Sequence, residues 1–478
     1  MCQRIERMKV VIMAGGKGTR ISSVASDIPK PMIKVEGIPV LEREIECLKN
    51  QGFDDIILTV SHLGNIIMDY FGDGSGSSPT TGRPFGVHIE YYFEKEPLGN
   101  AGALFKIKDK LTSDFLLLNA DAMFDVDFNR FVAFHRKHGG LVTLFTHPNS
   151  HPYDSGLIIA NKNGSVEKWL AKEDERPQYY RNRVNAGLHV INPEVLELVG
   201  INADSVGKIG VDGKPVKVDL DRQLLKPLAG TGKMFCYDSP EYVKDMGTPE
   251  RYYSVCKDCE EGRISAKNLK NKQKAIFLDR DGTINKYVGF LRNIDDFELI
   301  DGVAEAIRKI NESGYLAVVV TNQPVVARGE VSFEELEEIH NKMETLLGKE
   351  GVFLDDVFFC PHHPDKGYPE ENPAYKIPCE CRKPKTGMIE KAAERFNIDL
   401  KESWMIGDTT MDIQTGVNAG MRTALVLTGE AGKDKKYDVK PDLVCENLLD
   451  AVEIAGEGGD DDALLAAGED LEKRRSLR

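Results

Sequence analysis

Two segments of this sequence begin in the same way, and they constrain its fold more than any other feature. Each is a run of β-branched and aliphatic residues that stops at small or acidic residues: VVIMAGG at 10–16 and AIFLDRDG at 275–282. Such a run is typical of a buried parallel strand, and the loop after it lies at the carboxyl end of the sheet, where α/β domains bind ligands. The chain therefore predicts two α/β domains.

Strand and helix patterns alternate after each of these segments. The first is followed by the helical pattern VLEREIECLKNQG and the strands DIILTV, HIEYYFE and FLLLNAD. The second is followed by helices and strands in turn, namely VAEAIRKINESG, YLAVVVTN, FEELEEIHNKMETLLG, DVFFC, IEKAAERFN and WMIGD. These series predict an α/β fold class with two doubly wound domains, and a Rossmann-like mixed sheet in the N-terminal one.

The length of 478 residues agrees with two or three domains. The pattern predicts a first domain over 8–255, a polar linker over 256–273, a second domain over 274–455 and a flexible charged tail over 456–478.

Composition excludes several classes of function. The sequence has 62 basic and 77 acidic residues, a net charge of −15, which argues against a nucleic-acid partner. No apolar run approaches the roughly 18 to 20 residues of a membrane helix, and no signal-peptide segment develops, so we expect a cytoplasmic protein with no membrane partner. Nine cysteines without a secretory signal predict reduced thiols or metal ligands and not a disulfide framework.

A glycine-rich loop follows the first strand directly. In Gly15-Gly16-Lys17-Gly18-Thr19-Arg20, the glycines let backbone N–H groups approach a triphosphate and the basic residues oppose its charge. A plain tight turn is the alternative. Ten residues later, Ile28-Pro29-Lys30-Pro31-Met32 places a lysine on a stiff backbone, where little entropy is lost when it is fixed near phosphate.

Together these strings resemble the sugar-1-phosphate nucleotidyltransferase family, whose signature GGxGTRL…PKPM is matched apart from Ile21. The resemblance covers about residues 8 to 255 and includes the further blocks EPLGNAG (96–102), NAD (119–121), NAG (185–187) and KDMGT (244–248). It implies transfer of a nucleotidyl group from a nucleoside triphosphate, with GTP favoured, to a sugar 1-phosphate. The glutamate that often precedes Lys-Pro in this family is absent, since Ala171-Lys172-Glu173 stands there.

The resemblance also assigns roles in this first domain. Asp121 and Asp245 would hold Mg²⁺ on the α-phosphate, and Arg20 and Lys30 would be the catalytic cations. The nucleotide-binding residues would be Gly15, Gly16, Gly18, Thr19, Glu96 and Gly99, and the sugar- and phosphate-binding ones Asn185, Gly187 and Lys172.

In the second domain, Asp279 and Asp281 stand two residues apart at the end of a strand. One carboxylate so placed can attack phosphorus while the other protonates the leaving group, although such a pair can also be solvated acid. With Thr321-Asn322, Lys383 and Asp408, the pair resembles the haloacid dehalogenase (HAD) superfamily of phosphatases over roughly residues 274 to 450. Only 40 residues separate Asp281 from Thr321, by subtraction of their numbers, which leaves no room for a large cap domain.

The HAD resemblance implies a nucleophile, Asp279, and a general acid/base, Asp281. Thr321, Asn322, Arg328, Arg382 and Lys383 would bind the phosphate or the sugar. Mg²⁺ would be held by Asp279, Asp281 and Asp408, with Asp412 supporting that site.

Soft ligands gather in one loop of the second domain. Cys360, His362, Cys379 and Cys381 can close on tetrahedral Zn²⁺, and such closure would order a loop rich in proline and polar residues. The alternative is a set of buried, reduced cysteines. The CPH…CxCRKP loop, with LDRDGTIN and VVVTNQ…ARG, resembles the heptose bisphosphate phosphatases and their histidinol-phosphatase relatives.

The two resemblances combine into one reaction sequence. A phosphatase that removes the 7-phosphate of D-glycero-D-manno-heptose 1,7-bisphosphate yields a heptose 1-phosphate, which a nucleotidyltransferase can convert to GDP-heptose. The partners would thus be a nucleoside triphosphate, a sugar bisphosphate and a sugar 1-phosphate, and a homo-oligomer stays open. Two alternatives remain: mannose- or glucose-1-phosphate transfer beside a histidinol-phosphate-type or other small-molecule phosphatase, or one domain that is catalytically inactive.

Overall fold

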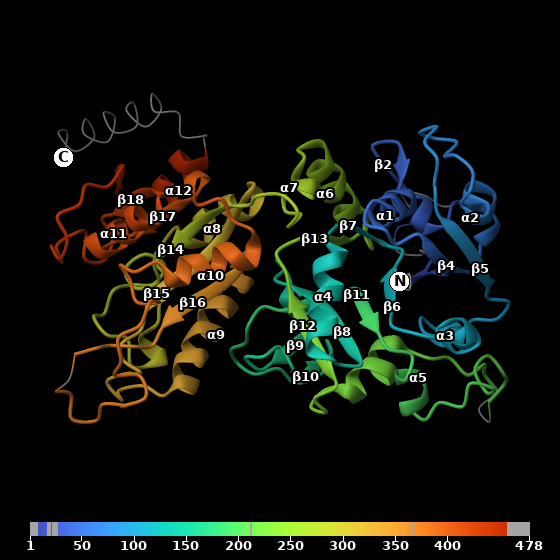
Figure 1. Cartoon of the computed structure of the whole chain (residues 1–478), viewed down its shortest axis with the longest axis horizontal. Coiled ribbons are helices and arrows are strands. Elements are labelled where there is room, and N and C mark those ends of the chain that lie inside the picture. Colours follow the sequence, from blue (N-terminus) through green and yellow to red (C-terminus); the bar gives the residue numbers. More distant parts are fainter. Residues whose placement is uncertain (1–7, 17–20, 22–26, 211–212, 366, 457–478) are drawn as a thin grey trace, which may run out of the picture. The chain divides into compact units, whose positions relative to one another are not determined.

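The computed structural model describes residues 8–16, 21, 27–210, 213–365 and 367–456 (Figure 1). Its contacts divide the chain into two compact units. Unit 1 comprises Met1–His147, Gly156–Glu173 and Val184–Asn268, and unit 2 comprises Pro148–Ser155, Asp174–Arg183 and Leu269–Arg478. Among the helices that are described, none is long and apolar enough to cross a membrane.

Unit 1 is built on a mixed sheet with the strand order β10-β9-β11-β6-β1-β4-β5. In addition, β8 pairs with β11, and β12 pairs with β8. The strands are β1 (Lys9–Met13), β4 (Asp55–Val60), β5 (His88–Phe93), β6 (Phe115–Asn119), β8 (Val142–His147), β9 (Leu157–Ala160), β10 (Val166–Leu170), β11 (Val184–Ile191) and β12 (Met234–Asp238). Two small ribbons join β2 (Lys34–Val35) to β3 (Ile38–Pro39) and β7 (Ala122–Asp125) to β13 (Tyr242–Asp245). The helices are α1 (Val40–Lys49), α2 (Gly64–Phe71), α3 (Gly102–Lys106), α4 (Phe128–His138), α5 (Val195–Leu198), α6 (Pro249–Glu260) and α7 (Arg263–Ala266).

Strand β1 shows why this sheet is covered on both faces. Successive side chains of a strand point to opposite faces, and every residue from Val10 to Ile12 is fully buried. Val10 and Ile12 pack into one apolar cluster, while Val11 packs into another. Because β1 pairs in parallel with both β4 and β6, the loops after these three strands meet at one edge of the sheet.

Unit 2 holds a parallel sheet with the order β16-β15-β14-β17-β18-β19. Its strands are β14 (Lys274–Leu278), β15 (Tyr315–Asn322), β16 (Asp356–Cys360), β17 (Trp404–Gly407), β18 (Arg422–Val426) and β19 (Leu443–Cys445). Its helices are α8 (Val303–Glu312), α9 (Phe333–Lys349), α10 (Gly387–Phe396), α11 (Thr410–Ala419) and α12 (Leu448–Gly456).

The helices of unit 2 follow from local sequence signals. In α8 the buried residues Val303, Ala306, Ile307 and Ile310 recur at helical spacing and pack with Ile276 of β14 in one cluster. Helix α9 begins at a capping box, in which Ser332 and Glu335 satisfy each other's backbone N–H groups. The α/β fold class expected from the sequence is confirmed, including parallel-rich sheets in both halves.

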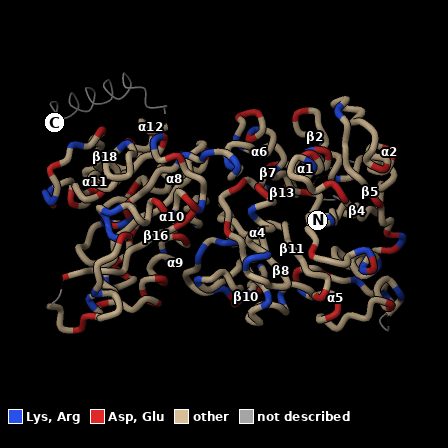
Figure 2. Tube along the Cα trace, viewed as in Figure 1, with Lys and Arg blue, Asp and Glu red and all other residues tan. Residues whose placement is uncertain are grey.

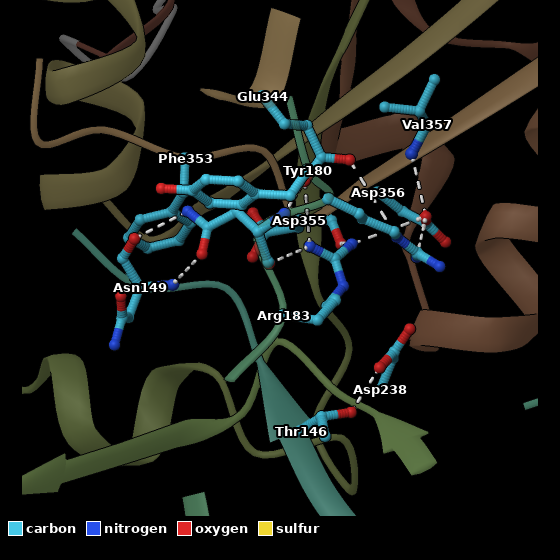
Figure 3. A network of polar contacts seen from close by, with 12 residues as sticks. Thr146, Asn149, Tyr180, Arg183, Asp238, Glu344, Phe353, Asp355, Asp356 and Val357 are labelled. Carbon is cyan, nitrogen blue, oxygen red and sulfur yellow. Dashed lines mark hydrogen bonds and ion pairs between the residues drawn. The ribbon is translucent and has the colours of Figure 1, made fainter. Parts of the chain in front are cut away.

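Two short segments that precede β14 by more than 80 residues belong to unit 2, and Figure 3 shows the polar network that holds one of them. Arg183 donates from Nη2 to the Asp355 carbonyl oxygen at 2.9 Å, and its Nη1 lies 3.4 Å from Glu344 Oε2. The backbone N–H of Tyr180 donates to the Thr345 hydroxyl at 2.9 Å. Arg183 and Glu344 are 3% and 4% exposed, so this is a buried ion pair.

The domain bounds predicted from the sequence differ from this division in two ways. The segment expected as a linker, 256–273, contains the end of α6 and all of α7, and the contact boundary lies between Asn268 and Leu269. The 148–155 and 174–183 segments were assigned by sequence to the first domain. Most of the tail expected over 456–478 lies outside the described residues.

Candidate active sites

A cavity of about 780 Å³ opens at the carboxyl ends of β1, β4 and β6 in unit 1. Six residues predicted from the sequence line it, namely Gly15, Gly16, Lys30, Glu96, Gly99 and Asp121. Its lining also includes Asn119 at the end of β6 and the exposed Lys217, which sequence reasoning missed. The predicted residues Gly18, Thr19 and Arg20, together with Lys17, lie outside the described residues. The cavity is large enough for a nucleotide-sized ligand.

Lys30 and Asp121 form an ion pair at this cavity. Lys30 Nζ lies 2.7 Å from Asp121 Oδ2, with the lysine side chain 9% exposed and the aspartate 45% exposed. Lys30 stands in a short turn, Lys30–Met32, that starts after Pro29. The stiff backbone thus aims a nearly buried ammonium group at a carboxylate that still faces the cavity, an arrangement suited to phosphate and a divalent cation.

Asp245 lies beside Asp121 because β13 pairs with β7. The register places Asp245 opposite Ala122, and Met246 N donates to the Asp121 carbonyl oxygen at 3.0 Å. Burial alone would raise the pKa of Asp245, but hydrogen bonds from Arg251 and Gly247 and the charge of Lys30 hold it below its ordinary value. Asp245 is therefore ionised at neutral pH, which is the state that metal binding would require.

Two glycines of the predicted site have a positive φ and a close neighbour, which is backbone at Gly99 and the Asn119 side chain at Gly187. Gly99 has φ +83°, and a Cβ there would lie 2.3 Å from the Val218 carbonyl oxygen. Gly187 has φ +78°, and a Cβ would lie 2.7 Å from Asn119 Nδ2. A larger residue would therefore strain the backbone at both positions, and at Gly99 it would also clash with the Val218 backbone. Gly187 N also donates to Asn185 Oδ1 at 3.3 Å.

Three residues predicted to contact the sugar are not part of the cavity lining: Asn185, Gly187 and Lys172. Gly187 nevertheless lies next to Asn119, which does line the cavity.

Sequence reasoning also missed Glu44 on α1, which is 1% exposed and has no hydrogen bond to either carboxylate oxygen within the described part of the chain. Burial, then the charge of Asp121, raises the pKa of Glu44 well above its ordinary value.

In unit 2, the segments after β14 and β17 bring together carboxylates predicted from the sequence. Asp279 follows β14 and Asp408 follows β17, and both come within 4.8 Å of each other and of Asp412. Burial and the neighbouring Asp412 raise the pKa of Asp279 to about 6, and burial with Asp279 and Asp412 raises that of Asp408 to about 8. These carboxylates repel one another when they are ionised, and a bound cation would relieve that repulsion.

Lys383 supplies part of that positive charge. Its Nζ lies 2.8 Å from Asp279 Oδ1 and 2.5 Å from Asp412 Oδ1, and its side chain is only 2% exposed. Burial would lower the pKa of Lys383, but these two carboxylates raise it, so the ammonium stays charged. Asn322 fixes the backbone of Lys383 by donating to its carbonyl oxygen at 3.1 Å and accepting from its N–H at 3.0 Å.

Asp281 is held in place from two sides. Arg280, which is fully buried, donates from Nη2 to Asp281 Oδ2 at 2.8 Å. Gln323 donates from Nε2 to Asp281 Oδ2 at 2.8 Å and to the Thr321 hydroxyl at 2.9 Å. Gln323 thereby connects the predicted acid/base to the predicted phosphate-binding threonine. Sequence reasoning quoted the TNQ string but gave Gln323 no role.

The carboxylate cluster fits Mg²⁺ on its own chemistry. Asp408 Oδ1 is buried without a hydrogen bond among the described residues, while Oδ2 accepts from Glu430 N at 2.7 Å. Gly282 and Gly429 leave no space for a Cβ, which would lie 2.3 and 2.2 Å from Asp408 Oδ2. An oxygen ligand set with one unsatisfied buried oxygen suits a hard divalent cation.

The four residues predicted as zinc ligands do gather in one place. Their ligand atoms lie within 4.8 Å of one another, in a set formed by Cys360, His362, Cys379 and Cys381. Cys381 Sγ lies 3.2 Å from Cys360 Sγ, 3.3 Å from Cys379 Sγ and 3.3 Å from His362 Nδ1. Its hydrogen bonds with Cys360, Cys379 and His362 lower the pKa of Cys381 to about 5. Three thiols and an imidazole in this geometry match the donor set of a structural zinc site.

The two remaining predicted residues, Arg328 and Arg382, carry positive charge beside this loop. Arg382 Nη1 donates to the His362 carbonyl oxygen at 3.2 Å, and Arg328 is 8% exposed. Burial lowers the pKa of His363, and the charges of Arg382, Arg328 and Lys376 lower it further. Several cations therefore act on one small region of unit 2.

Two family models match this chain. The model described as "Nucleotidyl transferase" matches residues 9–262, which is more than half of the 478, and the model described as "HAD-hydrolase-like" matches residues 380–451.

Curated relatives match the HAD-like half at high coverage. The D-glycero-beta-D-manno-heptose-1,7-bisphosphate 7-phosphatase of Haemophilus ducreyi is 42% identical over 182 residues, which is 38% of this chain and 97% of the relative. The enzyme of the same name from Yersinia pestis is 44% identical over 176 residues, or 37% of this chain and 92% of the relative.

Among solved structures, HddC from Yersinia pseudotuberculosis is 25% identical and covers 53% of this chain and 99% of its own, with a TM-score of 0.42. A D,D-heptose 1,7-bisphosphate phosphatase from B. bronchiseptica is 33% identical and covers 38% of this chain and 97% of its own, with a TM-score of 0.34.

Proposed function

This chain belongs to the nucleotidyl transferase family through residues 9–262 and to the D-glycero-beta-D-manno-heptose-1,7-bisphosphate 7-phosphatase family through its HAD-like half, and on that premise we propose two consecutive reactions. The chain is a bifunctional enzyme with a nucleotidyltransferase domain and a HAD phosphatase domain. The phosphatase removes the 7-phosphate of D-glycero-D-manno-heptose 1,7-bisphosphate. The nucleotidyltransferase then joins the resulting heptose 1-phosphate to a nucleotide, with GTP as the donor.

The phosphatase reaction uses the cluster around Asp279, and this cluster is the observation that carries the proposal. An oxygen of the Asp279 carboxylate attacks phosphorus, the bond from phosphorus to the sugar oxygen breaks, and Asp281 gives its proton to the leaving oxygen. Water then hydrolyses the aspartyl phosphate while Asp281 takes back a proton. Lys383, 2.8 Å from Asp279, would offset charge on the transferring phosphoryl group, and we assign Thr321 the role of binding its oxygens.

The nucleotidyltransferase reaction needs charge neutralisation more than a base. An oxygen of the sugar 1-phosphate attacks the α-phosphorus of the triphosphate in line and expels pyrophosphate. Lys30, nearly buried at the cavity, offsets charge on the phosphates, and Gly99 lets the backbone approach the nucleotide. We assign Arg20 the same kind of role as Lys30.

Metal ions complete both sites in this proposal. Asp279, Asp281 and Asp408 would hold one Mg²⁺, and Asp121 and Asp245 another; bound there, Mg²⁺ would neutralise developing charge on phosphate oxygens. Cys360, His362, Cys379 and Cys381 would hold a structural Zn²⁺.

The order of the two reactions follows from their chemistry. Removal of a distal phosphate leaves the anomeric phosphate that a nucleotidyltransferase requires as its acceptor. Both substrates are charged metabolites, so we place the enzyme in the cytoplasm, where nucleoside triphosphates are available. Acidic and basic residues are interspersed along each unit (Figure 2). Basic groups can therefore bind phosphate at individual sites although the chain as a whole is acidic.

Two single substitutions separate the activities. Asp279→Asn should abolish release of phosphate from the heptose bisphosphate and leave transfer to supplied heptose 1-phosphate unchanged. Asp121→Ala should abolish nucleotidyl transfer to heptose 1-phosphate and leave release of phosphate from the heptose bisphosphate unchanged. If either variant keeps the turnover of its own half, the role given to that residue is wrong. If neither half accepts a heptose substrate, the substrate proposal is wrong.

A further inference from the structure

A polar residue interrupts the apolar face of α9. The buried residues Leu336, Met343 and Leu347 recur at helical spacing, and His340 falls in the same stripe at 7% exposure. Burying an imidazole costs free energy unless it is hydrogen-bonded, and an aliphatic side chain would satisfy the packing of this face at less cost. The partner of His340 therefore has to explain its presence here.

That partner is Arg280, in the loop after β14. Arg280 Nη1 lies 3.2 Å from His340 Nε2. Because a guanidinium has donors and no acceptor, Nε2 must be the unprotonated nitrogen of a neutral ring. Burial, and then the charge of Arg280, lower the pKa of His340 well below its ordinary value, in agreement with a neutral imidazole. The ring of Phe359 packs against it at a centroid distance of 5.1 Å.

The other guanidinium nitrogens of Arg280 donate to Asp281. Nε lies 3.1 Å from Asp281 Oδ1, and Nη2 lies 2.9 Å from Oδ1 and 2.8 Å from Oδ2. Arg280 is fully buried, and within the described residues His340 is the hydrogen-bond partner of Nη1. Without that acceptor, Nη1 would be a buried donor left unpaired, which costs free energy and favours rotation of the guanidinium.

The orientation of the Asp281 carboxylate depends mainly on Arg280. Two neutral amides also donate to this carboxylate, Asn285 Nδ2 to Oδ1 at 3.1 Å and Gln323 Nε2 to Oδ2 at 2.8 Å. Hydrogen bonds between a guanidinium and a carboxylate are stronger than those from a neutral amide, and two parallel bonds fix the plane of the carboxylate. Rotation of the Arg280 guanidinium would therefore release Asp281 from its present orientation.

We propose that His340 is a positioning residue of the phosphatase, which accepts a hydrogen bond from Arg280 and thereby holds Asp281 in one orientation for proton transfer. The inference rests on the proposed function, because that function gives Asp281 the proton transfer to the leaving oxygen. His340 acts through Arg280 and has no contact with the Lys383 ammonium among those that the structure describes. Its loss should slow proton transfer and leave phosphate binding intact.

The test compares two substrates of the full chain that differ in their need for an acid. The sugar alkoxide that leaves heptose 1,7-bisphosphate must be protonated, whereas p-nitrophenolate is weakly basic and leaves with little help. We expect His340→Leu to lower kcat/KM about tenfold for the bisphosphate and less than about twofold for p-nitrophenyl phosphate. His340→Gln keeps an acceptor near the position of Nε2 and should stay within about threefold of the wild type on both.

A matched control separates positioning from packing. Ile339 is the neighbour of His340 on α9 and is 1% exposed, so Ile339→Val should lower the Tm of unit 2 and change kcat/KM for either substrate by less than about twofold. His340→Asn replaces His340→Leu if the leucine variant does not fold, because its shorter amide lies near the position of Nδ1 and does not reach Arg280. It should show the same difference between the two substrates.

The outcomes separate this inference from the proposed function. Equal losses on both substrates, no loss on either, or a glutamine variant as slow as the leucine variant would overturn the positioning role. If the wild type does not hydrolyse the heptose bisphosphate, the proposed function fails, and crystal structures of the variants decide about His340. An Asp281 carboxylate that is displaced in His340→Leu and retained in His340→Gln would then support the inference, and an unmoved carboxylate in both would overturn it.

Discussion

Substitution of Arg183 by methionine tests whether the segment 174–183 is part of the phosphatase fold. Arg183 is 3% exposed and bonds to Glu344 and to the Asp355 carbonyl oxygen (Figure 3). Its Nη2 also lies 3.7 Å from Asp356 Oδ1. Methionine would preserve much of the packing but leave the buried carboxylate of Glu344 without its closest cation.

These contacts set limits on the free energy of unfolding that the Arg183→Met substitution should remove. Removal of one partner from a buried ion pair typically costs about 3–5 kcal/mol. Asp356 keeps Arg395 at 2.7 Å and Arg181 at 3.0 Å, which places the expected loss near the lower end, about 3 kcal/mol. For a unit of this size that corresponds to a fall of roughly 6–12 °C in Tm.

Fluorescence of Trp404 reports the unfolding of unit 2 alone once the other tryptophan, Trp169, is replaced by phenylalanine. Trp404 is 1% exposed in the parallel sheet. Arg308→Met, which removes a partly exposed arginine from the same unit, should cost less than about 1 kcal/mol. The double variant Arg183→Met/Glu344→Gln should recover at least about 1 kcal/mol, because no buried charge is then left unpaired. Equal losses for Arg183→Met and Arg308→Met, or no recovery in the double variant, would refute this reasoning.

Four further predictions concern the two sites. The raised pKa values of Asp279 and Asp408, about 6 and 8, mean that the folded protein without metal binds more protons than the unfolded chain between about pH 4 and 8. Its free energy of unfolding should therefore fall over that range, and stabilisation by Mg²⁺, which needs ionised carboxylates, should be larger at pH 8 than at pH 5 in thermal melts; equal stabilisation would contradict this. Lys383→Met should lower phosphatase kcat by about 10²–10³-fold while transfer activity stays intact, as a split assay would show. Cys381→Ser should lower the zinc content measured by atomic absorption and the Tm of unit 2, and unchanged zinc would exclude it as a ligand. Gly99→Ala should weaken nucleotide binding at least tenfold in calorimetry, because a Cβ would lie 2.3 Å from the Val218 carbonyl oxygen; normal binding would show that the loop relaxes freely.

Features that depend on local pattern could be predicted from the sequence. The strand at Ala275–Leu278 and the buried face of α8 follow from the period of apolar residues, and parallel pairing then brings Asp279 and Asp408 to one edge. The four soft ligands were predicted from their spacing, and the structure brings them together. These successes share a cause: the position of each group is set by the element that immediately precedes it.

Contacts between distant segments could not be predicted in this way. Nothing in the sequence around Arg183 indicates that its guanidinium is buried against Glu344, since charge alone is typical of a solvated surface. Phe290 stands in one stretch of the sequence, and Tyr368 and Lys376 stand in another. The two stretches share no motif, and only the folded loops bring these residues together near Arg328. The role of Gln323 was equally invisible, because its two partners come from different strands.

The central claim is that one chain converts a heptose bisphosphate into a nucleotide-activated heptose. It is tested most directly by incubating the protein with Mg²⁺, D-glycero-D-manno-heptose 1,7-bisphosphate and each nucleoside triphosphate in turn, followed by mass spectrometry of the products. The account predicts inorganic phosphate in every reaction and GDP-heptose with pyrophosphate in the reaction that contains GTP. No nucleotide-heptose in any reaction, together with a nucleotide sugar from mannose 1-phosphate, would contradict it.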